Sequence, residues 1–283
     1  MQREPTVSER DAFGGNIQHD VHDFASFLLG HVDDETNMRR DHTMVEPKMY
    51  TSNDGTISQN ALDYWRLHRT YMDSILDRYF RSLEVNIRRC SGCPEERDFA
   101  DGWHTALRVQ QGDSDTVEFA QLLARYFAPG DPFRCTTCLA TDRMQQARYA
   151  RMPDRLVFMI ARFGATSKLK NKVRFPTRNL DLTRYFVDPD QTGASSTDRH
   201  FSGPMIYDCY AVVVHSGNTL NSGHYYAFVQ DEQSRDPTDW WECNDHECTR
   251  VKIDSQHPND DTEKMYQRGT AHPYLLFYKR QGT

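Results

Sequence analysis

The chain has 283 residues and a formal net charge of −7, with 37% hydrophobic residues, which is enough apolar surface for one large domain or two small ones. The acidic balance and the lack of any long Lys/Arg run exclude nucleic acid as an expected partner and favour one with a basic surface. No stretch approaches the roughly 20 apolar residues of a membrane span, and residues 1–5 lack the apolar core of a secretory signal. We therefore expect an intracellular protein of the cytoplasm, the nucleus or both, with no membrane partner.

Helices are expected first along the chain. A helix is predicted over about residues 21–32, because apolar side chains recur there at helical spacing, namely Val21, Phe24, Ala25, Leu28 and Val32. Asp20 can cap its start. A second helix is expected over about 61–80 and a third over about 117–127, where Pro129 and the glycine after it end the pattern.

Strands follow the helices. Short β-branched or aromatic runs occupy residues 156–163, 209–215, 225–230 and 274–279, and Gly, Pro, Asn and Asp clusters separate them. The intervals contain no helix of crossover length, which favours an antiparallel sheet. The sequence therefore predicts an α+β fold with helices first and a long sheet after them.

Four of the seven cysteines form two Cys-x-x-Cys pairs, namely Cys90 with Cys93 and Cys135 with Cys138. Two residues between thiols let both sulfurs turn toward one ion, and two such turns complete a tetrahedral zinc site with Zn–S distances of about 2.3 Å. Four thiolates leave no open position, so the predicted zinc is structural and lies at the end of an extended hairpin. The alternative is four free cysteines in an irregular loop.

One histidine is a candidate general base. His224 follows Gly223 and precedes a strand pattern, and Asn244 and Asp245 follow another short strand. A general base is held in one tautomer by a group bonded to its other nitrogen, and Asn244 or Asp245 could supply that group. A single histidine beside a strand is more often structural, so chemistry alone leaves both interpretations open.

The segments together resemble the ubiquitin-specific protease family, a papain-like class of cysteine peptidases. Residues 18–24, Gln-His-Asp-Val-His-Asp-Phe, are similar to the family's Gln-Gln-Asp-Ala-His-Glu-Phe box. The other matching segments occur in family order and are 65–93, 152–163, 172–176, 180–182, 207–215, 223–225, 240–245 and 273–280.

The resemblance implies a single hand-shaped domain over 1–283, with the remaining helical thumb at about 18–80, fingers carrying the zinc site at about 81–150, and a palm carrying the histidine box at about 151–280. It implies that the partner is ubiquitin or a ubiquitinated protein.

The same resemblance implies a role for each site residue. His224 is the general base, Asn244 its orienting partner, and Asp245 assists. Asp20 contacts the basic C-terminal tail of ubiquitin. Gly223 and Tyr225 line the passage for the terminal glycines of that tail.

The family's nucleophilic cysteine box has no counterpart, because no cysteine precedes Cys90. Cys209 lies within a strand pattern, Cys243 points away from the face of Asn244 on a strand, and Cys248 lies in a turn-like segment. We expect a truncated thumb and an inactive chain, with cleavage of the (iso)peptide bond after the last glycine of ubiquitin occurring in the full-length protein. The alternatives are a ubiquitin-binding pseudoenzyme and, disfavoured by the charge, a zinc-ribbon nucleic-acid module.

Overall fold

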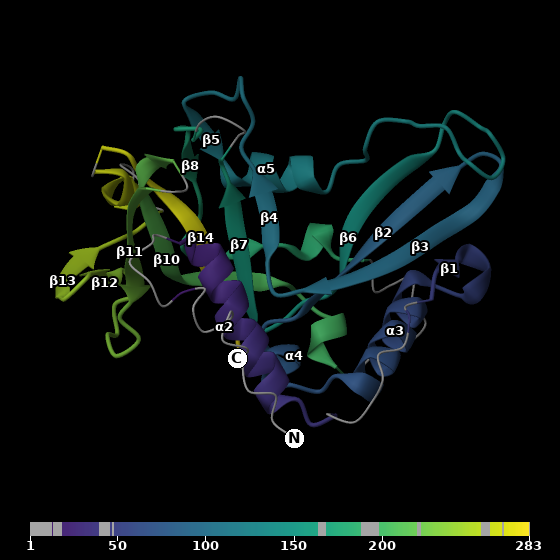
Figure 1. Cartoon of the computed structure of the whole chain (residues 1–283), viewed down its shortest axis with the longest axis horizontal. Helices are drawn as coiled ribbons and strands as arrows, with labels where there is room; N and C mark the ends of the chain where they lie inside the picture. Colours follow the sequence, from purple (N-terminus) through teal and green to yellow (C-terminus); the bar gives the residue numbers. More distant parts are fainter. Residues whose placement is uncertain are drawn as a thin grey trace.

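The computed structural model describes residues 13, 19–39, 46, 48–163, 168–187, 198–219, 222–255, 261–267 and 269–282. Gln18, the first residue of the 18–24 box, lies outside the described residues. Two sheets occupy opposite sides of the molecule, and helices lie along and between them (Figure 1). No helix in these described ranges is both long and apolar enough to cross a membrane.

The larger sheet has eight strands. Seven run in the order β13-β12-β11-β10-β14-β7-β4, and β9 pairs with β10 beside this path. In chain order they are β4 (Thr105–Arg108), β7 (Arg155–Ala161), β9 (Leu180–Asp181), β10 (Ile206–Thr219), β11 (Ser222–Gln230), β12 (Asp239–Asn244), β13 (Glu247–Lys252) and β14 (Ala271–Arg280).

The predicted antiparallel pairing is confirmed for most of this sheet but is wrong for its β4 edge. β4 and β7 are parallel, as are β5 (Thr116–Glu118) and β8 (Lys172–Arg174) of a small separate sheet. The chain leaves β4 and returns to β7 only after a helix and a strand of the other sheet, and such a long crossover is what a parallel pair requires.

The smaller sheet is antiparallel, with the order β1-β3-β2-β6. Its strands are β1 (Tyr50–Thr51), β2 (Ser82–Cys90), β3 (Cys93–Gly102) and β6 (Met144–Arg151). Leu83, Val85 and Ile87 of β2 are buried while Glu84, Asn86 and Arg88 between them are less so, which is the period of two that a half-covered sheet requires. The long β2–β3 hairpin carries its tip away from the rest of the molecule (Figure 1).

Helix α2 (Val21–Thr36) begins at its predicted cap, Asp20. The predicted 61–80 helix is two helices, α3 (Ile57–Tyr71) and α4 (Ile75–Tyr79). The break occurs at Ser74, whose hydroxyl accepts a bond from the amide of Asp77, while the Asp77 carboxylate accepts from the amide of Ser74. This capping box restarts the helix, and Ser-x-x-Asp was its signal in the sequence.

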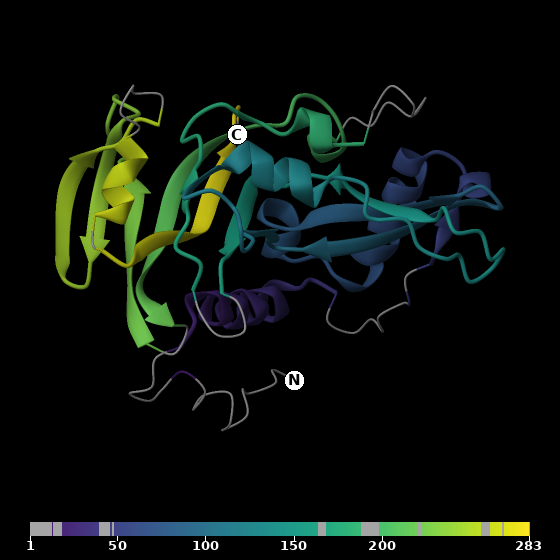
Figure 2. The same ribbon diagram turned by 90° about the horizontal axis from the view of Figure 1, so that it is seen from above.

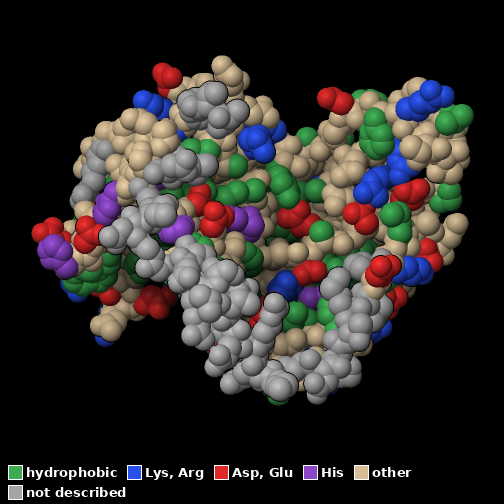
Figure 3. Space-filling view, in the orientation of Figure 1, with side chains coloured by type: hydrophobic (Ala, Val, Ile, Leu, Met, Phe, Trp, Pro, Cys, Tyr) green, Lys and Arg blue, Asp and Glu red, His purple; other side chains and the backbone are tan. Residues whose placement is uncertain are grey.

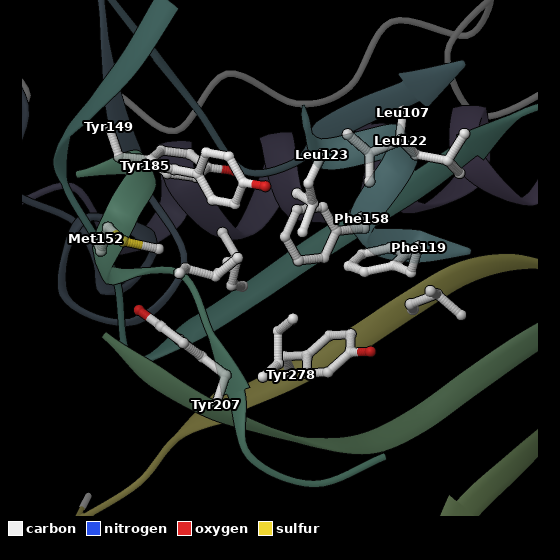
Figure 4. Packing of buried hydrophobic residues seen from close by; sticks show 14 of the residues in the cluster. Leu107, Phe119, Leu122, Leu123, Tyr149, Met152, Phe158, Tyr185, Tyr207 and Tyr278 are labelled. Carbon is white, nitrogen blue, oxygen red and sulfur yellow. The ribbon is translucent and has the colours of Figure 1, made fainter. Parts of the chain in front are cut away.

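Helix α5 (Phe119–Tyr126) covers the larger sheet. Its Phe119 ring packs edge-on against Phe158 of β7 at 5.1 Å between centroids, and Phe158 packs against Tyr278 of β14 at 5.8 Å. Leu122 and Leu123 complete this cluster (Figure 4). The packing fixes β7 and β14 and, through β14, the strand pair β10–β11 that carries the candidate site.

Short 3₁₀ helices connect the remaining elements, and they are η1 (Ser52–Asp54), η2 (Thr183–Tyr185), η4 (Arg199–Phe201) and η5 (Asp261–Tyr266). Helix α2 lies beside the larger sheet but has no fully buried residue, and Phe24 and Leu28 are 44% and 49% exposed (Figure 2). The apolar face that the sequence predicted for α2 is therefore only partly covered within the described residues.

Candidate active site and metal centre

His224 and Asn244 meet on neighbouring strands of the larger sheet. His224 lies near the start of β11 and Asn244 at the end of β12, and the two strands pair from Ala227↔Cys243 to Gln230↔Trp240. The His224 Nε2 atom lies 2.5 Å from the Asn244 Oδ1 atom. An N–H at Nε2 donates to this amide oxygen, which leaves Nδ1 as the free, proton-accepting nitrogen. The histidine side chain is 45% exposed and so is open to a substrate.

Asp245 lies one residue beyond this pair, in the turn that joins β12 to β13. Its Oδ2 atom is 3.8 Å from His224 Nε2, which is too far for a hydrogen bond. Its φ of 53° is the left-handed conformation typical of a two-residue hairpin turn. The turn therefore places both residues that the sequence proposed as partners within reach of His224.

Gly223 has a local steric reason to be glycine. Its φ is +155°, and a Cβ atom added there would lie 2.4 Å from the backbone oxygen of Ser216 and 2.5 Å from His215 Nε2. The two atoms belong to β10, which pairs with β11 at this point. Any side chain at position 223 would therefore push the start of the His224 strand away from β10.

Tyr225 packs over a buried polar network beneath the site. Its ring lies 4.8 Å from the His215 ring and 6.4 Å from the Tyr274 ring. His215 is fully buried, and its Nδ1 accepts a hydrogen bond from Lys168 Nζ at 3.0 Å. Burial and the Lys168 ammonium lower the pKa of His215 to about 4, so the imidazole is neutral and structural.

Asp20 connects helix α2 to the same sheet. Its Oδ1 accepts the backbone N–H of His22 at 2.7 Å, and its Oδ2 accepts the Tyr274 hydroxyl at 2.8 Å. Burial and the Asp20 charge raise the pKa of Tyr274, so its hydroxyl remains a donor. The carboxylate is thus fixed between α2 and β14 and has further acceptor capacity for a cationic ligand.

The four paired cysteines converge at the far end of the smaller sheet. Cys90 and Cys93 face each other at the tip of the β2–β3 hairpin, and the four sulfurs lie within 4.8 Å of one another. Cys90 Sγ is 3.7 Å from Cys138 Sγ, and Cys93 Sγ is 3.9 Å from Cys135 Sγ. Tetrahedral zinc with bonds of about 2.3 Å separates its sulfurs by about 3.8 Å, so the donor set fits this ion.

The surroundings of the cysteines also fit a metal site. Backbone N–H groups of the Cys135–Cys138 turn, and the Arg143 guanidinium 3.2 Å from the Cys135 sulfur, lower the pKa of Cys135 to about 5. Gly92 leaves room at the tip, because a Cβ there would lie 2.7 Å from Cys138 Sγ. The site thus has hydrogen-bond donors directed at the Cys135 sulfur and a close-packed cradle.

Comparison with known proteins identifies the family of the chain. The family described as "Ubiquitin carboxyl-terminal hydrolase" matches residues 5–278 of the chain. The chain belongs to this family. The fold agrees, because the chain superposes on the solved structure titled "Structure of the SAGA Ubp8/Sgf11/Sus1/Sgf73 DUB module bound to ubiquitin aldehyde" with a TM-score of 0.64 and 18% identity, covering 96% of this chain and 51% of that one.

Curated relatives carry the same family name. Ubiquitin carboxyl-terminal hydrolase 2 of Bos taurus is 27% identical over 281 residues, which cover 94% of this chain and 41% of that protein. Ubiquitin carboxyl-terminal hydrolase 3 of Mus musculus is 33% identical over 132 residues, which cover 45% of this chain and 21% of that protein. The chain therefore spans less than half the length of these two relatives.

The family assignment and the ubiquitin-specific protease fold that the sequence motifs suggested are confirmed. The structure brings His224, Asn244 and Asp245 together at one end of the larger sheet and the four cysteines together at the end of the smaller one. Between the two sheets this face is hollowed, and acidic and histidine side chains gather in the hollow (Figure 3).

Sequence reasoning missed three features of the hydrolase domain. It did not find Tyr274 as the partner of Asp20, the buried Lys168–His215 pair, or the contact between Cys243 and Cys248 across the β12–β13 hairpin. None of the three has a recognisable signal in the sequence, because two of them join segments far apart along the chain and the third depends on a hairpin turn. Among the described residues, no cysteine sulfur hydrogen-bonds to His224.

Proposed function

We propose that this chain carries the ubiquitin-recognition surface and the general base of a thiol-dependent deubiquitinase. The full-length protein would cleave the (iso)peptide bond after the C-terminal glycine of ubiquitin. The observation that supports this most directly is the 2.5 Å contact between His224 Nε2 and Asn244 Oδ1 within a domain matched by the family over residues 5–278. Asn244 holds the ring through Nε2, which leaves Nδ1 of this partly exposed side chain to exchange a proton with the reacting groups.

In the proposed reaction, His224 takes the proton of a cysteine thiol. The resulting thiolate attacks the glycine carbonyl carbon, and the imidazolium returns the proton to the leaving amine as the C–N bond breaks. Water then releases ubiquitin from the thioester with His224 again acting as base. Asp245, 3.8 Å from Nε2, stabilises the imidazolium that forms in each step.

None of the cysteines in the described residues hydrogen-bonds to His224, so the nucleophilic thiol of the proposed reaction is not among the contacts of this histidine. Cys209 is fully buried, and Cys243 contacts Cys248 rather than the imidazole. We therefore expect the 283-residue chain by itself to hydrolyse no ubiquitin C-terminal amide reporter. Reporter turnover by the purified chain that is lost in His224→Ala would contradict this and would make Cys243 and Cys248 the nucleophiles to test by substitution.

The lack of a cysteine thiol beside His224 among the described residues also favours a second candidate function, a ubiquitin-binding domain without catalysis. Intact mass and N-terminal peptide analysis of the native protein from its own cells separates the two. A longer species with an additional cysteine that reacts with a ubiquitin C-terminal electrophile supports the hydrolase. A species of 283 residues that binds ubiquitin and does not react supports the binding domain.

Ubiquitin recognition is proposed to involve Asp20, Gly223 and Tyr225. Asp20→Asn tests the charge of residue 20 alone, because asparagine caps helices about as well as aspartate. We expect this variant to bind ubiquitin about 5- to 30-fold more weakly, which corresponds to roughly 1–2 kcal/mol for a charge-assisted contact. Tyr274→Phe is the matched control, since it removes the partner of Asp20 Oδ2 but keeps the carboxylate. An unchanged binding isotherm for Asp20→Asn would remove Asp20 from the recognition surface.

Structural zinc is proposed for the four-cysteine cluster of Cys90, Cys93, Cys135 and Cys138. The ion would fix the β2–β3 hairpin tip to the segment before β6, and all four positions would be taken by sulfur. Metal analysis of protein purified without chelator should give one equivalent of zinc, and less than half an equivalent would contradict the proposal. Structural disulfides are rare in intracellular proteins, so the use of these four cysteines to bind a metal fits an intracellular location.

A further inference from the structure

Two cysteines outside the metal cluster face each other beside the candidate active site. Cys243 of β12 and Cys248 of β13 are directly paired across the hairpin, and their sulfurs are 3.1 Å apart. Both are free thiols. The two residues flank the segment that contains Asn244 and Asp245, so the pair closes the hairpin end that holds the partners of His224.

The backbone positions suit a disulfide bond. Residues directly opposite in an antiparallel pair have Cα atoms about 4.5–5.5 Å apart, within the range of about 4.4–6.8 Å that disulfides span. A bond of about 2.05 Å requires the sulfurs to move together by about 1 Å, which side-chain rotation and a small shift of the hairpin can provide. β13 is the outermost strand of its sheet, so no further strand resists this shift.

The pair is also chemically distinct from the other cysteines. Four belong to the metal cluster, and Cys209 is fully buried. Cys248 is exposed, and its contact with Cys243 raises the pKa of the Cys243 thiol to about 11. Cys243 therefore keeps its proton at neutral pH, and Cys248 is the sulfur that a reagent in solution can reach.

We propose that Cys243 and Cys248 form a reversible disulfide that responds to low-molecular-weight disulfides such as glutathione disulfide. The Cys248 thiolate attacks one sulfur of glutathione disulfide and releases one glutathione thiolate. Cys243, after losing its proton, attacks the Cys248 sulfur of the mixed disulfide and releases the second glutathione. The protein dithiol is oxidised to a disulfide, and one glutathione disulfide is reduced to two glutathione molecules.

Oxidation would change the surroundings of His224, which is the general base of the proposed function. Asn244 follows Cys243 directly, and its Oδ1 lies 2.5 Å from His224 Nε2. Closing the 3.1 Å between the two sulfurs to about 2.05 Å is a large change compared with the narrow distance range of a hydrogen bond, and Cys243 and Cys248 share this movement. The redox state of the pair therefore sets how well Asn244 is aligned with His224.

Mass spectrometry of the zinc-loaded chain tests the bond itself. The tryptic peptide 236–250 contains both cysteines of the pair and no other. After equilibration with glutathione buffers of increasing disulfide content, acid quenching and alkylation, we expect this peptide to change from two alkyl groups to none, with loss of two hydrogens. Dithiothreitol should reverse the change. Cys248→Ser is the control and should never lose both hydrogens.

Two results would overturn the proposal. Persistence of two alkyl groups at every buffer ratio, or of a glutathione adduct that never closes, would show that the pair does not form a bond. The link to the site is tested by the nitrogen-15 signals of the His224 ring, which should shift on oxidation in the wild type but not in the Cys243→Ser, Cys248→Ser double variant. Unshifted signals in a chain whose disulfide has formed would overturn that link. Neither readout requires catalysis or ubiquitin binding.

Discussion

Replacing Gly223 with alanine tests why the residue before His224 is a glycine. The added Cβ would lie 2.4 Å from the Ser216 backbone oxygen and 2.5 Å from His215 Nε2, with a φ of +155° that alanine rarely adopts. Neither neighbour can turn away, because one is backbone in a paired strand and the other is a fully buried ring.

The expected loss of stability can be worked out from these two contributions. A non-glycine residue in a sparsely populated backbone region costs about 1–3 kcal/mol. Forcing an extra carbon into a packed site costs a further 1–3 kcal/mol or so. Gly223→Ala should therefore lower the free energy of unfolding by about 2–6 kcal/mol, a large part of the roughly 5–15 kcal/mol of a typical domain.

Gly112 is a matched control. It also has a positive φ, +93°, but a Cβ there would meet nothing within 4 Å. Gly112→Ala should thus show the backbone contribution alone, about 1–3 kcal/mol. Urea unfolding followed by tryptophan fluorescence measures both variants. Equal losses in the two variants would refute the steric argument for position 223 and leave the substrate passage as the remaining reason for its glycine.

Two further predictions concern the buried histidine and the metal cradle. Burial lowers the pKa of His215 to about 4, so the unfolded chain binds the proton more tightly between that pH and about 6.5. The contribution of His215 to the free energy of unfolding is complete above pH 6.5, and about 3 kcal/mol of it should be lost as the pH falls toward 4. Denaturant titrations at several pH values measure this loss. If the free energy of unfolding of His215→Asn fell with pH as steeply as that of the wild type, the prediction would be contradicted. Gly92→Ala should lower zinc affinity at least tenfold in a chelator competition, because the added Cβ would lie 2.7 Å from Cys138 Sγ. Gly102→Ala is the control and should bind zinc normally, because the nearest atom to its added Cβ would lie at 3.9 Å. Equal affinities for the two glycine variants would show that the cradle adapts.

The extent to which the sequence predicts this molecule depends on how local each feature is. The β-branched and aromatic runs at 156–163 and 274–279 and the two Cys-x-x-Cys pairs are local patterns, and the structure contains the strands β7 and β14 and the cluster that they predict. The bond between Asp20 and Tyr274 joins residues 254 positions apart, and no local pattern encodes it. Only the assembled sheet brings the two side chains together.

The contact between Cys243 and Cys248 was missed for a different reason. It depends on a tight turn at Asp245 and its histidine neighbour, and this dipeptide lacks the Asn-Gly or Asp-Gly signal of such hairpins. The parallel β4–β7 pair was missed because strand direction is set by the return path of the chain and not by strand composition. Both errors concern pairing partners, which propensity does not specify.

The position of β14 has a consequence for biosynthesis. This strand lies between β10 and β7 in the larger sheet, although both partners are made long before it. At about 5–20 residues per second, roughly 5–20 s pass between synthesis of the end of β7 and the start of β14. One edge of β7 is unpaired during all of that time, and one edge of β10 is unpaired from the synthesis of Thr219 onward; both strands are rich in buried apolar residues. Nascent chains that stop before residue 271 should therefore require chaperones, since open apolar strand edges promote association with other chains.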